Sequence, residues 1–157
     1  MTLRFGAPWS TPLTAISALL VGVTVVAVVL KAPIAVALLG ATVALAGAFA
    51  VLGYVVEPGA LVIRRPGWQT RLDLTTLDSA TVDPDAMKAA LRTFGIGGPF
   101  AFVGRYRSRA VGPFSAYATD PRRCVVLRWP DRTVVVTPDD PDSFATAVEA
   151  AAERGAL

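Results

Sequence analysis

The chain has 157 residues, of which 54% are hydrophobic and 17% are charged, whereas soluble domains carry about 25% charged residues. It contains no histidine and a single cysteine, Cys124, which excludes an internal disulfide and argues against most proton-transfer enzymes. The net charge of +3 falls to +1 over residues 57–157, where thirteen basic face twelve acidic side chains, and this argues against nucleic-acid binding.

The hydrophobic excess lies in residues 13–56, where Lys31 is the one charged side chain. Two apolar runs, 13–30 and 34–56, are predicted to be transmembrane helices, since 18 helical residues already reach about 27 Å. The three residues between them make the helices antiparallel neighbours. A cleaved signal peptide is the alternative for the first run, but the run is longer than a usual signal sequence and a second apolar run follows at once.

The flanking charges predict the orientation of this hairpin. Arg4 precedes it, and Arg64, Arg65 and Arg71 follow it, against the lone Lys31 in the connection. Because basic residues accumulate on the cytoplasmic side, both termini are expected there, with residues 1–12 as a cytoplasmic segment. Trp9 and Tyr54 are expected to form the aromatic belt at that interface.

A stripe of small residues runs along both predicted helices. Small side chains let helix backbones approach closely within a bilayer. The stripe either packs one helix of the hairpin on the other or docks on another membrane protein. Its members are Ala18, Gly22, Gly40, Ala44 and Gly47.

Residues 57–157 form one predicted soluble domain of short strands and one helix. A Pro66-Gly67 turn predicts a hairpin, and residues 75–91 leave the strand register open, with a short helix after Asp83-Pro84 as one option. A C-terminal helix is expected after Pro138, with Asp140 or Asp142 as cap and an apolar face of Phe144, Val148 and Ala151. The predicted strands are Leu61–Arg65, Trp68–Leu74, Phe100–Ser108, Gly112–Thr119, Cys124–Trp129 and Thr133–Thr137.

The stretches Gly95–Tyr106, Gly112–Asp120, Val125–Leu127, Val134–Pro138 and Asp140–Phe144 resemble, in this order, the bacterial pleckstrin-homology-like (PH-like) domain family. The resemblance covers about residues 57–155, and similar members often place the domain after a two-helix membrane hairpin. It implies an α+β fold in which a bent, seven-stranded antiparallel β-barrel or sandwich is capped by the C-terminal helix. It also implies a multi-pass protein of the bacterial cytoplasmic (inner) membrane. The family carries no catalytic motif to transfer.

A candidate binding surface comes from arginines in the basic middle of the domain, since residues 64–132 carry twelve basic and six acidic side chains. Arg105, Arg107 and Arg109 alternate, so a strand would project all three from one face, and Arg122 and Arg123 are expected to extend it. Guanidinium groups bind phosphates, so this surface is predicted to contact anionic lipid headgroups or a partner. The alternative is a solvated face, or arginines paired with the acidic residues 139–157.

No residue pattern predicts a catalytic, cofactor or metal site. Gly95–Gly98 leads into a predicted strand instead of a helix, which argues for a bend or bulge and against a phosphate-binding loop. Cys124 is the first residue of a predicted apolar strand and is expected to be a core residue. The pairs Asp139-Asp140 and Asp83 with Asp85 are expected to cap turns.

The sequence therefore favours a non-catalytic interaction or scaffold subunit of a larger membrane complex, of the respiratory, photosynthetic, transport or secretion kind. Its expected partners are the lipid bilayer and other integral membrane proteins. The alternative function is a membrane-tethered sensor or a module that binds anionic lipid headgroups through the arginine surface.

Overall fold

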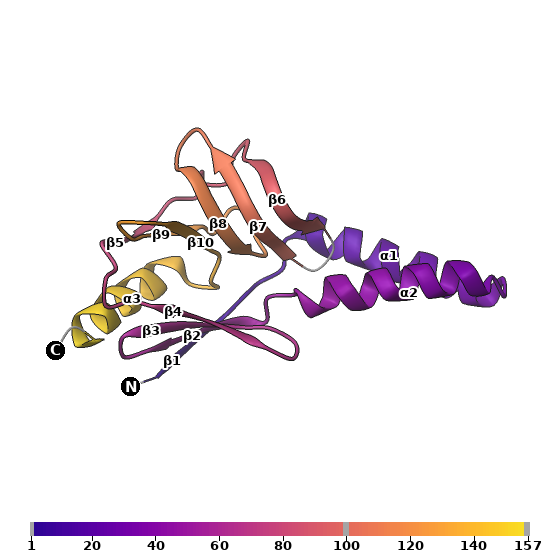
Figure 1. The fold of residues 1–157 in the computed structure, drawn as a ribbon, viewed down its shortest axis with the longest axis horizontal. Helices are drawn as coiled ribbons and strands as arrows, with labels where there is room; N and C mark the ends of the chain where they lie inside the picture. Colours follow the sequence, from indigo (N-terminus) through magenta and orange to yellow (C-terminus); the bar gives the residue numbers. More distant parts are fainter. Residues whose placement is uncertain (1, 99–100, 156–157) are drawn as a thin grey trace.

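The computed structural model describes residues 2–98 and 101–155. A hairpin of two helices, α1 (Thr11–Val29) and α2 (Pro33–Ala48), projects from one end of a two-sheet β domain (Figure 1). The C-terminal helix α3 (Pro141–Gly155) lies at the opposite end of that domain. The chain is thus an α+β fold in which the hairpin and α3 flank the sheets.

The helix α1 is long and apolar enough to cross a membrane, while α2 is apolar but shorter, with 16 residues. Only 17% of the most apolar window of α1 is buried, so α1 is not the core helix of a globular domain. Large side chains instead lie open along both helices, including Val29 (71% exposed) and Ile34 (76%). The antiparallel hairpin is as predicted, with Lys31 in its turn at a φ of 52°.

The predicted second helix, 34–56, is too long. It ends at Ala48, and residues 53–57 form strand β2 (Gly53–Glu57), which pairs with strand β1 (Leu3–Gly6) and with strand β3 (Ala60–Arg64). An apolar run alone cannot separate a buried strand from a helix, which is why the prediction failed here. The segment before the first helix is therefore not separate from the β domain, because its residues Leu3–Gly6 form β1, an edge strand of the first sheet.

The first sheet has the order β1-β2-β3-β4 and is antiparallel throughout. The predicted hairpin around Pro66-Gly67 is confirmed as β3 and β4 (Gln69–Asp73). The Arg65 amide donates to the Trp68 carbonyl at 3.1 Å across the turn, and Gly67 has a φ of +87°, which a residue with a Cβ rarely adopts.

The second sheet has the order β5-β9-β10-β8-β7-β6. The predicted strands between residues 100 and 137 are confirmed to within a residue or two, although Phe100 lies outside the described residues. The neighbours β10 and β8 are parallel, because the chain leaves β8, forms the β9–β10 hairpin and returns beside β8. These six strands are β5 (Ser79–Val82), β6 (Leu91–Gly98), β7 (Ala101–Ser108), β8 (Gly112–Ala118), β9 (Val125–Arg128) and β10 (Thr133–Val136).

The resemblance implies seven antiparallel strands in a bent barrel or sandwich, and the observed topology corrects the strand number, the antiparallel pairing and the barrel. The described residues hold ten strands in two separate sheets, one of them mixed. Gly95–Gly98 pairs with β7 to its last residue, so it leads from strand to strand and forms no phosphate-binding loop. The bulge in β6 lies between Arg92 and Phe94 instead of at the glycines.

The main core fills the space between the two sheets and under α3. It contains Tyr54 and Leu61 from the first sheet, Leu127 from the second, and the predicted apolar face of α3, with Phe144 fully buried. Burying one such side chain stabilises the fold by about 1.5–3 kcal/mol. A second cluster around Tyr106, Phe114, Cys124 and Val126 lies on the other face of the second sheet.

Residues 83–90 cover this second cluster. They form consecutive turns in place of the short helix considered for residues 85–91. Asp83 caps the first turn, with its carboxylate accepting the Asp85 amide at 3.0 Å, and Ala86 is fully buried in the cluster. Asp83 therefore has the capping role that the sequence predicts.

Candidate functional site

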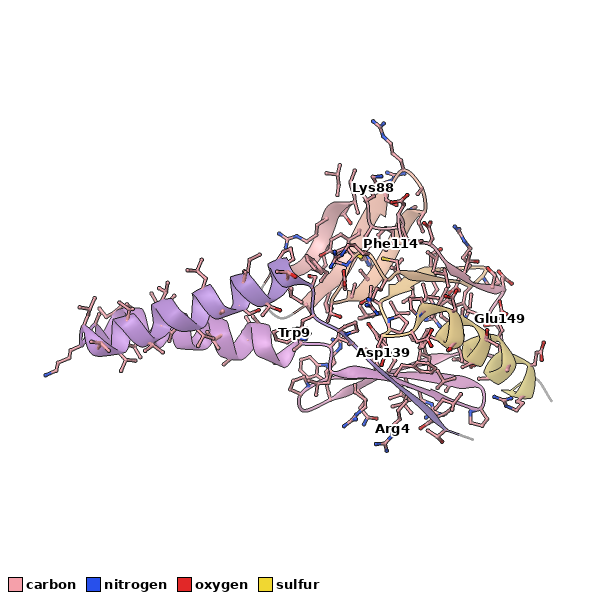
Figure 2. All side chains as sticks on the ribbon, turned by 180° about the vertical axis from the view of Figure 1, so that it is seen from behind. Arg4, Trp9, Lys88, Phe114, Asp139 and Glu149 are labelled. Carbon is pink, nitrogen blue, oxygen red and sulfur yellow. The ribbon has the colours of Figure 1, made fainter. Side chains whose placement is uncertain are left out.

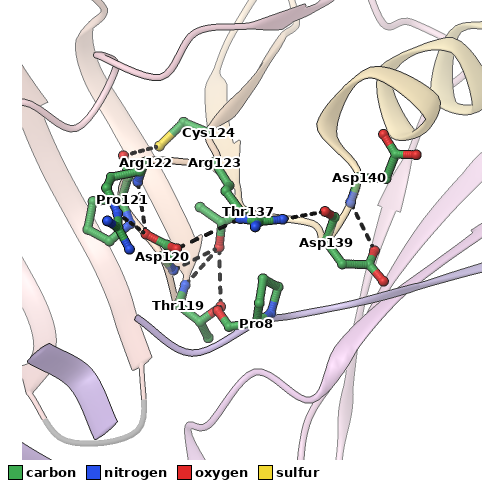
Figure 3. A network of polar contacts seen from close by, with 10 residues as sticks. All are labelled: Pro8, Thr119, Asp120, Pro121, Arg122, Arg123, Cys124, Thr137, Asp139 and Asp140. Atoms are coloured by element: carbon green, nitrogen blue, oxygen red, sulfur yellow. Dashed lines mark hydrogen bonds and ion pairs between the residues drawn. The ribbon is translucent and has the colours of Figure 1, made fainter. Parts of the chain in front are cut away.

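Both ends of the hairpin are fastened to the β domain. On the α1 side the Thr119 hydroxyl donates to the Pro8 carbonyl at 2.8 Å (Figure 3), and the Ser10 amide donates to the Thr119 carbonyl at 3.2 Å. On the α2 side the Leu52 amide donates to the Arg64 carbonyl at 2.9 Å. These bonds set the position of the hairpin relative to the sheets.

Two of the predicted site residues, Arg122 and Arg123, lie next to Thr119 and contact Asp120 and Asp139. The side chain of Arg122 lies 3.3 Å from the Asp120 carboxylate, and the Arg123 guanidinium donates to the Asp139 carbonyl at 2.6 Å (Figure 3). They follow the C-terminal end of β8, whereas Arg109 precedes its N-terminal end. The structure therefore does not bring them together with Arg109 in one surface.

The other three arginines lie along β7 and the turn after it. Arg105 and Arg107 are exposed while Tyr106 and Ser108 are buried, which confirms the predicted alternation, and Arg109 is exposed in the turn. No ion pair involves any of these arginines among the described residues, so pairing with the acidic tail is not observed. Strand β7 begins at the hairpin end of the domain and runs away from it (Figure 1), and Arg105 is the first of the three arginines along the chain.

Arg105 lines a cavity of about 650 Å³ at the junction of the hairpin and the second sheet. The cavity combines basic groups with apolar and aromatic walls. Its lining residues come from the end of α2, the end of β3 and strands β6 to β8, and they are Phe49, Arg65, Phe94, Val103, Gly104, Arg105, Ser115 and Tyr117.

Arg65 is the second cationic residue of this cavity. Its guanidinium carbon lies 4.9 Å from the centre of the Tyr117 ring, a cation–π contact. Its Nε is buried and has no hydrogen-bond partner, and burial lowers the pKa of Arg65, a shift that Tyr117 opposes. Sequence reasoning used Arg65 only to orient the hairpin, since no local pattern reveals that the end of β3 meets β8.

Aromatic side chains surround the base of the hairpin. Phe49 packs edge-on against Trp68 with ring centroids 5.2 Å apart, and Trp68 and Phe94 are 45% and 76% exposed. Trp9, expected in an aromatic belt, is 39% exposed just before α1. Tyr54 is instead 1% exposed in the core, so its assignment to that belt is wrong.

The stripe of small residues does not pack the hairpin. A Cβ placed on Gly22, Gly40 or Gly47 meets nothing within 4 Å outside its own helix, and Ala18 and Ala44 are exposed. Other positions are buried on α1, namely Leu13, Ser17 and Ala27. Open space therefore lies over Gly22, Gly40 and Gly47, although Gly40 and Gly47 are themselves half-buried.

Cys124 is confirmed as a core residue. It is fully buried, its thiol donates to the Pro121 carbonyl at 3.2 Å, and burial raises the pKa of the thiol to about 12. A thiol with that pKa remains protonated near neutral pH and is a poor nucleophile. Across residues 2–98 and 101–155, no three His, Cys, Asp or Glu side chains are grouped so as to hold a metal ion.

Comparison with known proteins identifies the β domain. No curated protein and no solved structure shows a significant match to the chain. The family model described as "Bacterial PH domain" matches residues 52–152, which begins at β2 and ends within α3. Because this match spans well over half of the 157 residues and the fold carries the helix-capped sheets that the resemblance implies, the chain belongs to the bacterial PH domain family.

Proposed function

We propose that this protein is a non-catalytic, membrane-anchored interaction subunit of a larger protein complex in the bacterial cytoplasmic membrane. The observation that carries the proposal is the apolar hairpin itself. Its helices expose side chains such as Leu19 (68%) and Leu38 (66%), in addition to Val29 and Ile34. Each such side chain gains about 1.5–3 kcal/mol on leaving water, so the hairpin favours a bilayer over solvent.

The shortness of α2 supports a protein partner in the membrane. Sixteen helical residues reach about 24 Å, less than the roughly 30 Å hydrocarbon core of a bilayer. A short spanning helix is accommodated by local thinning of the bilayer or by association with other helices. The small-residue stripe, with open space over Gly40 and Gly47, offers a surface for such association.

The charge distribution supports an orientation with both termini and the PH domain in the cytoplasm. Arg4 in β1, Arg64 at the end of β3 and Arg71 in β4 all lie in the β domain that adjoins the open end of the hairpin. Lys31 lies alone at its closed end. Under the positive-inside rule, the end with more basic residues stays in the cytoplasm.

A second contact surface is available at the edge of the second sheet. Strand β6 is the last strand of that sheet, so within the described part of the chain no strand pairs with its outer edge, and it exposes Leu91 (75%) and Phe94 (76%). Exposed apolar side chains on an unpaired edge are typical of protein contact sites. Phe94 also lines the same cavity as Phe49, the residue after α2, so this edge lies near the base of the hairpin, where a partner in the same membrane can reach it.

Photo-crosslinking in cells tests this proposal. A photoreactive residue at Phe94 or at Ala44, on the exposed hairpin surface, is expected to yield a discrete crosslink to another membrane protein, which also co-purifies in mild detergent. The control is Glu149 on α3, which Figure 2 shows on the far side of the β domain from the hairpin. If Phe94 and Ala44 crosslink no more than Glu149 and the protein is extracted as a free monomer, the proposal is wrong.

A further inference from the structure

The cavity beside the hairpin concentrates positive charge without a compensating carboxylate. Arg65 and Arg105 both line it, and no acidic side chain is among its lining residues. The buried Arg65 Nε has no hydrogen-bond partner among the described residues, and a buried donor without a partner is destabilising. Guanidinium groups bind phosphate oxygens in a fork geometry, so an anion with several oxygens is the group that would satisfy this cavity.

The remaining walls are apolar. Phe49, Phe94, Val103 and Tyr117 contribute apolar and aromatic surface, and Ser115 adds a hydroxyl. A small free anion would leave these walls unoccupied, whereas an amphiphile with an anionic head and an apolar body would cover both parts. A volume of about 650 Å³ lies within the range of roughly 300–1,000 Å³ that is usual for small-molecule sites.

The position of the cavity indicates where such an amphiphile comes from. Phe49 follows the last residue of α2 directly, so the cavity opens where the apolar hairpin meets the β domain. In a bilayer this level corresponds to the headgroup layer of the cytoplasmic leaflet, which carries the anionic lipids. A lipid there can place its phosphate in the cavity while its acyl chains remain beside the hairpin.

We propose that this cavity binds the headgroup of one anionic glycerophospholipid, with Arg65 and Arg105 contacting its phosphate. The inference rests on the proposed insertion of the hairpin, because that insertion brings the cavity to the headgroup layer. It differs from a general basic surface on β7, since Arg107 and Arg109 lie outside the cavity and Arg65 comes from the other sheet.

Native mass spectrometry of the full chain tests the site. The protein is reconstituted in nanodiscs that contain equal amounts of phosphatidylglycerol and phosphatidylcholine. The wild type is expected to retain one phosphatidylglycerol after release from the disc. In the variant Arg65→Gln/Arg105→Gln the retained fraction of phosphatidylglycerol should fall by about tenfold or more, as expected for the loss of charged hydrogen bonds.

A second variant is needed because Arg65 also supports the fold through its contact with Tyr117. Arg105→Gln alone changes an exposed side chain and should lower the retained fraction in the same direction.

The control variant is Arg107→Gln/Arg109→Gln, which removes the same charge outside the cavity and should leave retention unchanged. Equal retention of the two lipids, or an equal loss in the control variant, overturns a specific site. Displacement of the lipid by millimolar inorganic phosphate identifies a free anion as the occupant, and a retained acidic peptide from the host identifies a protein segment; either result overturns the proposal. A chain that does not enter nanodiscs refutes the proposed membrane insertion instead, and with it a lipid as the occupant.

Discussion

Tyr54 joins the two sheets through its hydroxyl. It donates to the Tyr117 carbonyl in β8 at 2.6 Å and accepts the Thr137 amide at 3.1 Å, just after β10. Its ring packs on Phe144 of α3 with centroids 5.7 Å apart. Sequence reasoning placed Tyr54 at a membrane interface because it lies near the end of the apolar run 34–56, and that run does not reveal the partners of the hydroxyl.

The variant Tyr54→Phe is expected to lower the free energy of unfolding by about 1–3 kcal/mol, since the Tyr117 carbonyl and the Thr137 amide would remain buried without this partner. Denaturant unfolding of the full chain in detergent measures the change. Tyr106→Phe is the matched control, because the Tyr106 hydroxyl is buried without a hydrogen-bond partner and its removal should cost nothing. Equal losses in the two variants would contradict the bridging role of Tyr54.

Tyr54 also makes the free energy of unfolding depend on pH in the alkaline range. Burial raises the pKa of Tyr54 from 10.0 to about 12, so the folded state holds this proton more tightly than the unfolded state does. The corresponding stability is fully present below pH 10 and is lost as the pH rises through 12. The unfolding free energy of the wild type should fall across this window, and it should fall less steeply in Tyr54→Phe. Identical slopes would show that Tyr54 does not carry this dependence.

At the scale of elements, composition predicted the hairpin and turn chemistry predicted the β3–β4 pair. The boundary of α2 was missed, because Val51–Val56 is as apolar as a helix core and only its pairing with β1 and β3 makes part of it a strand. The parallel β8–β10 contact and the cavity were also beyond prediction. Both depend on segments that are distant in sequence, such as Arg65 and Tyr117, and no local period encodes them.

The pairing of β1 with β2 depends on the absence of a side chain at Gly53. A Cβ on Gly53 would lie 2.8 Å from the Phe5 carbonyl oxygen, too close for any side chain. Gly53→Ala is therefore expected to loosen β1 and to speed tryptic cleavage after Arg4 by roughly tenfold, through local opening. Gly22→Ala, at a position with open space, should leave cleavage unchanged. Protection of Arg4 in Gly53→Ala equal to that in the wild type would contradict the pairing.

The small-residue stripe can be tested apart from the fold. Gly40→Leu/Gly47→Leu fills open space, so the unfolding midpoint in detergent should stay within a few degrees of the wild type. If the stripe docks on a partner, the same variant loses the crosslink from Ala44. A large drop in the midpoint would mean that these glycines pack the hairpin after all.

At the scale of the whole molecule, several contacts join the hairpin to the PH domain, among them β1 with β2, Pro8 and Ser10 with Thr119, and Leu52 with Arg64. If the hairpin inserts in a bilayer as proposed, these contacts set the orientation of the domain at the membrane surface. The cavity lies at the same end of the domain as the hairpin, since Phe49, which follows α2, is among its lining residues.

Cysteine accessibility in spheroplasts tests the proposed topology most directly. The native thiol gives little background, because Cys124 is buried and has a pKa of about 12. Lys31→Cys, in the hairpin turn, should react with a membrane-impermeant maleimide in intact spheroplasts, whereas Asp131→Cys, in the exposed β9–β10 turn, should react only after lysis. Labelling of Asp131→Cys before lysis, or protection of Lys31→Cys, would contradict a hairpin that crosses the membrane with its PH domain in the cytoplasm.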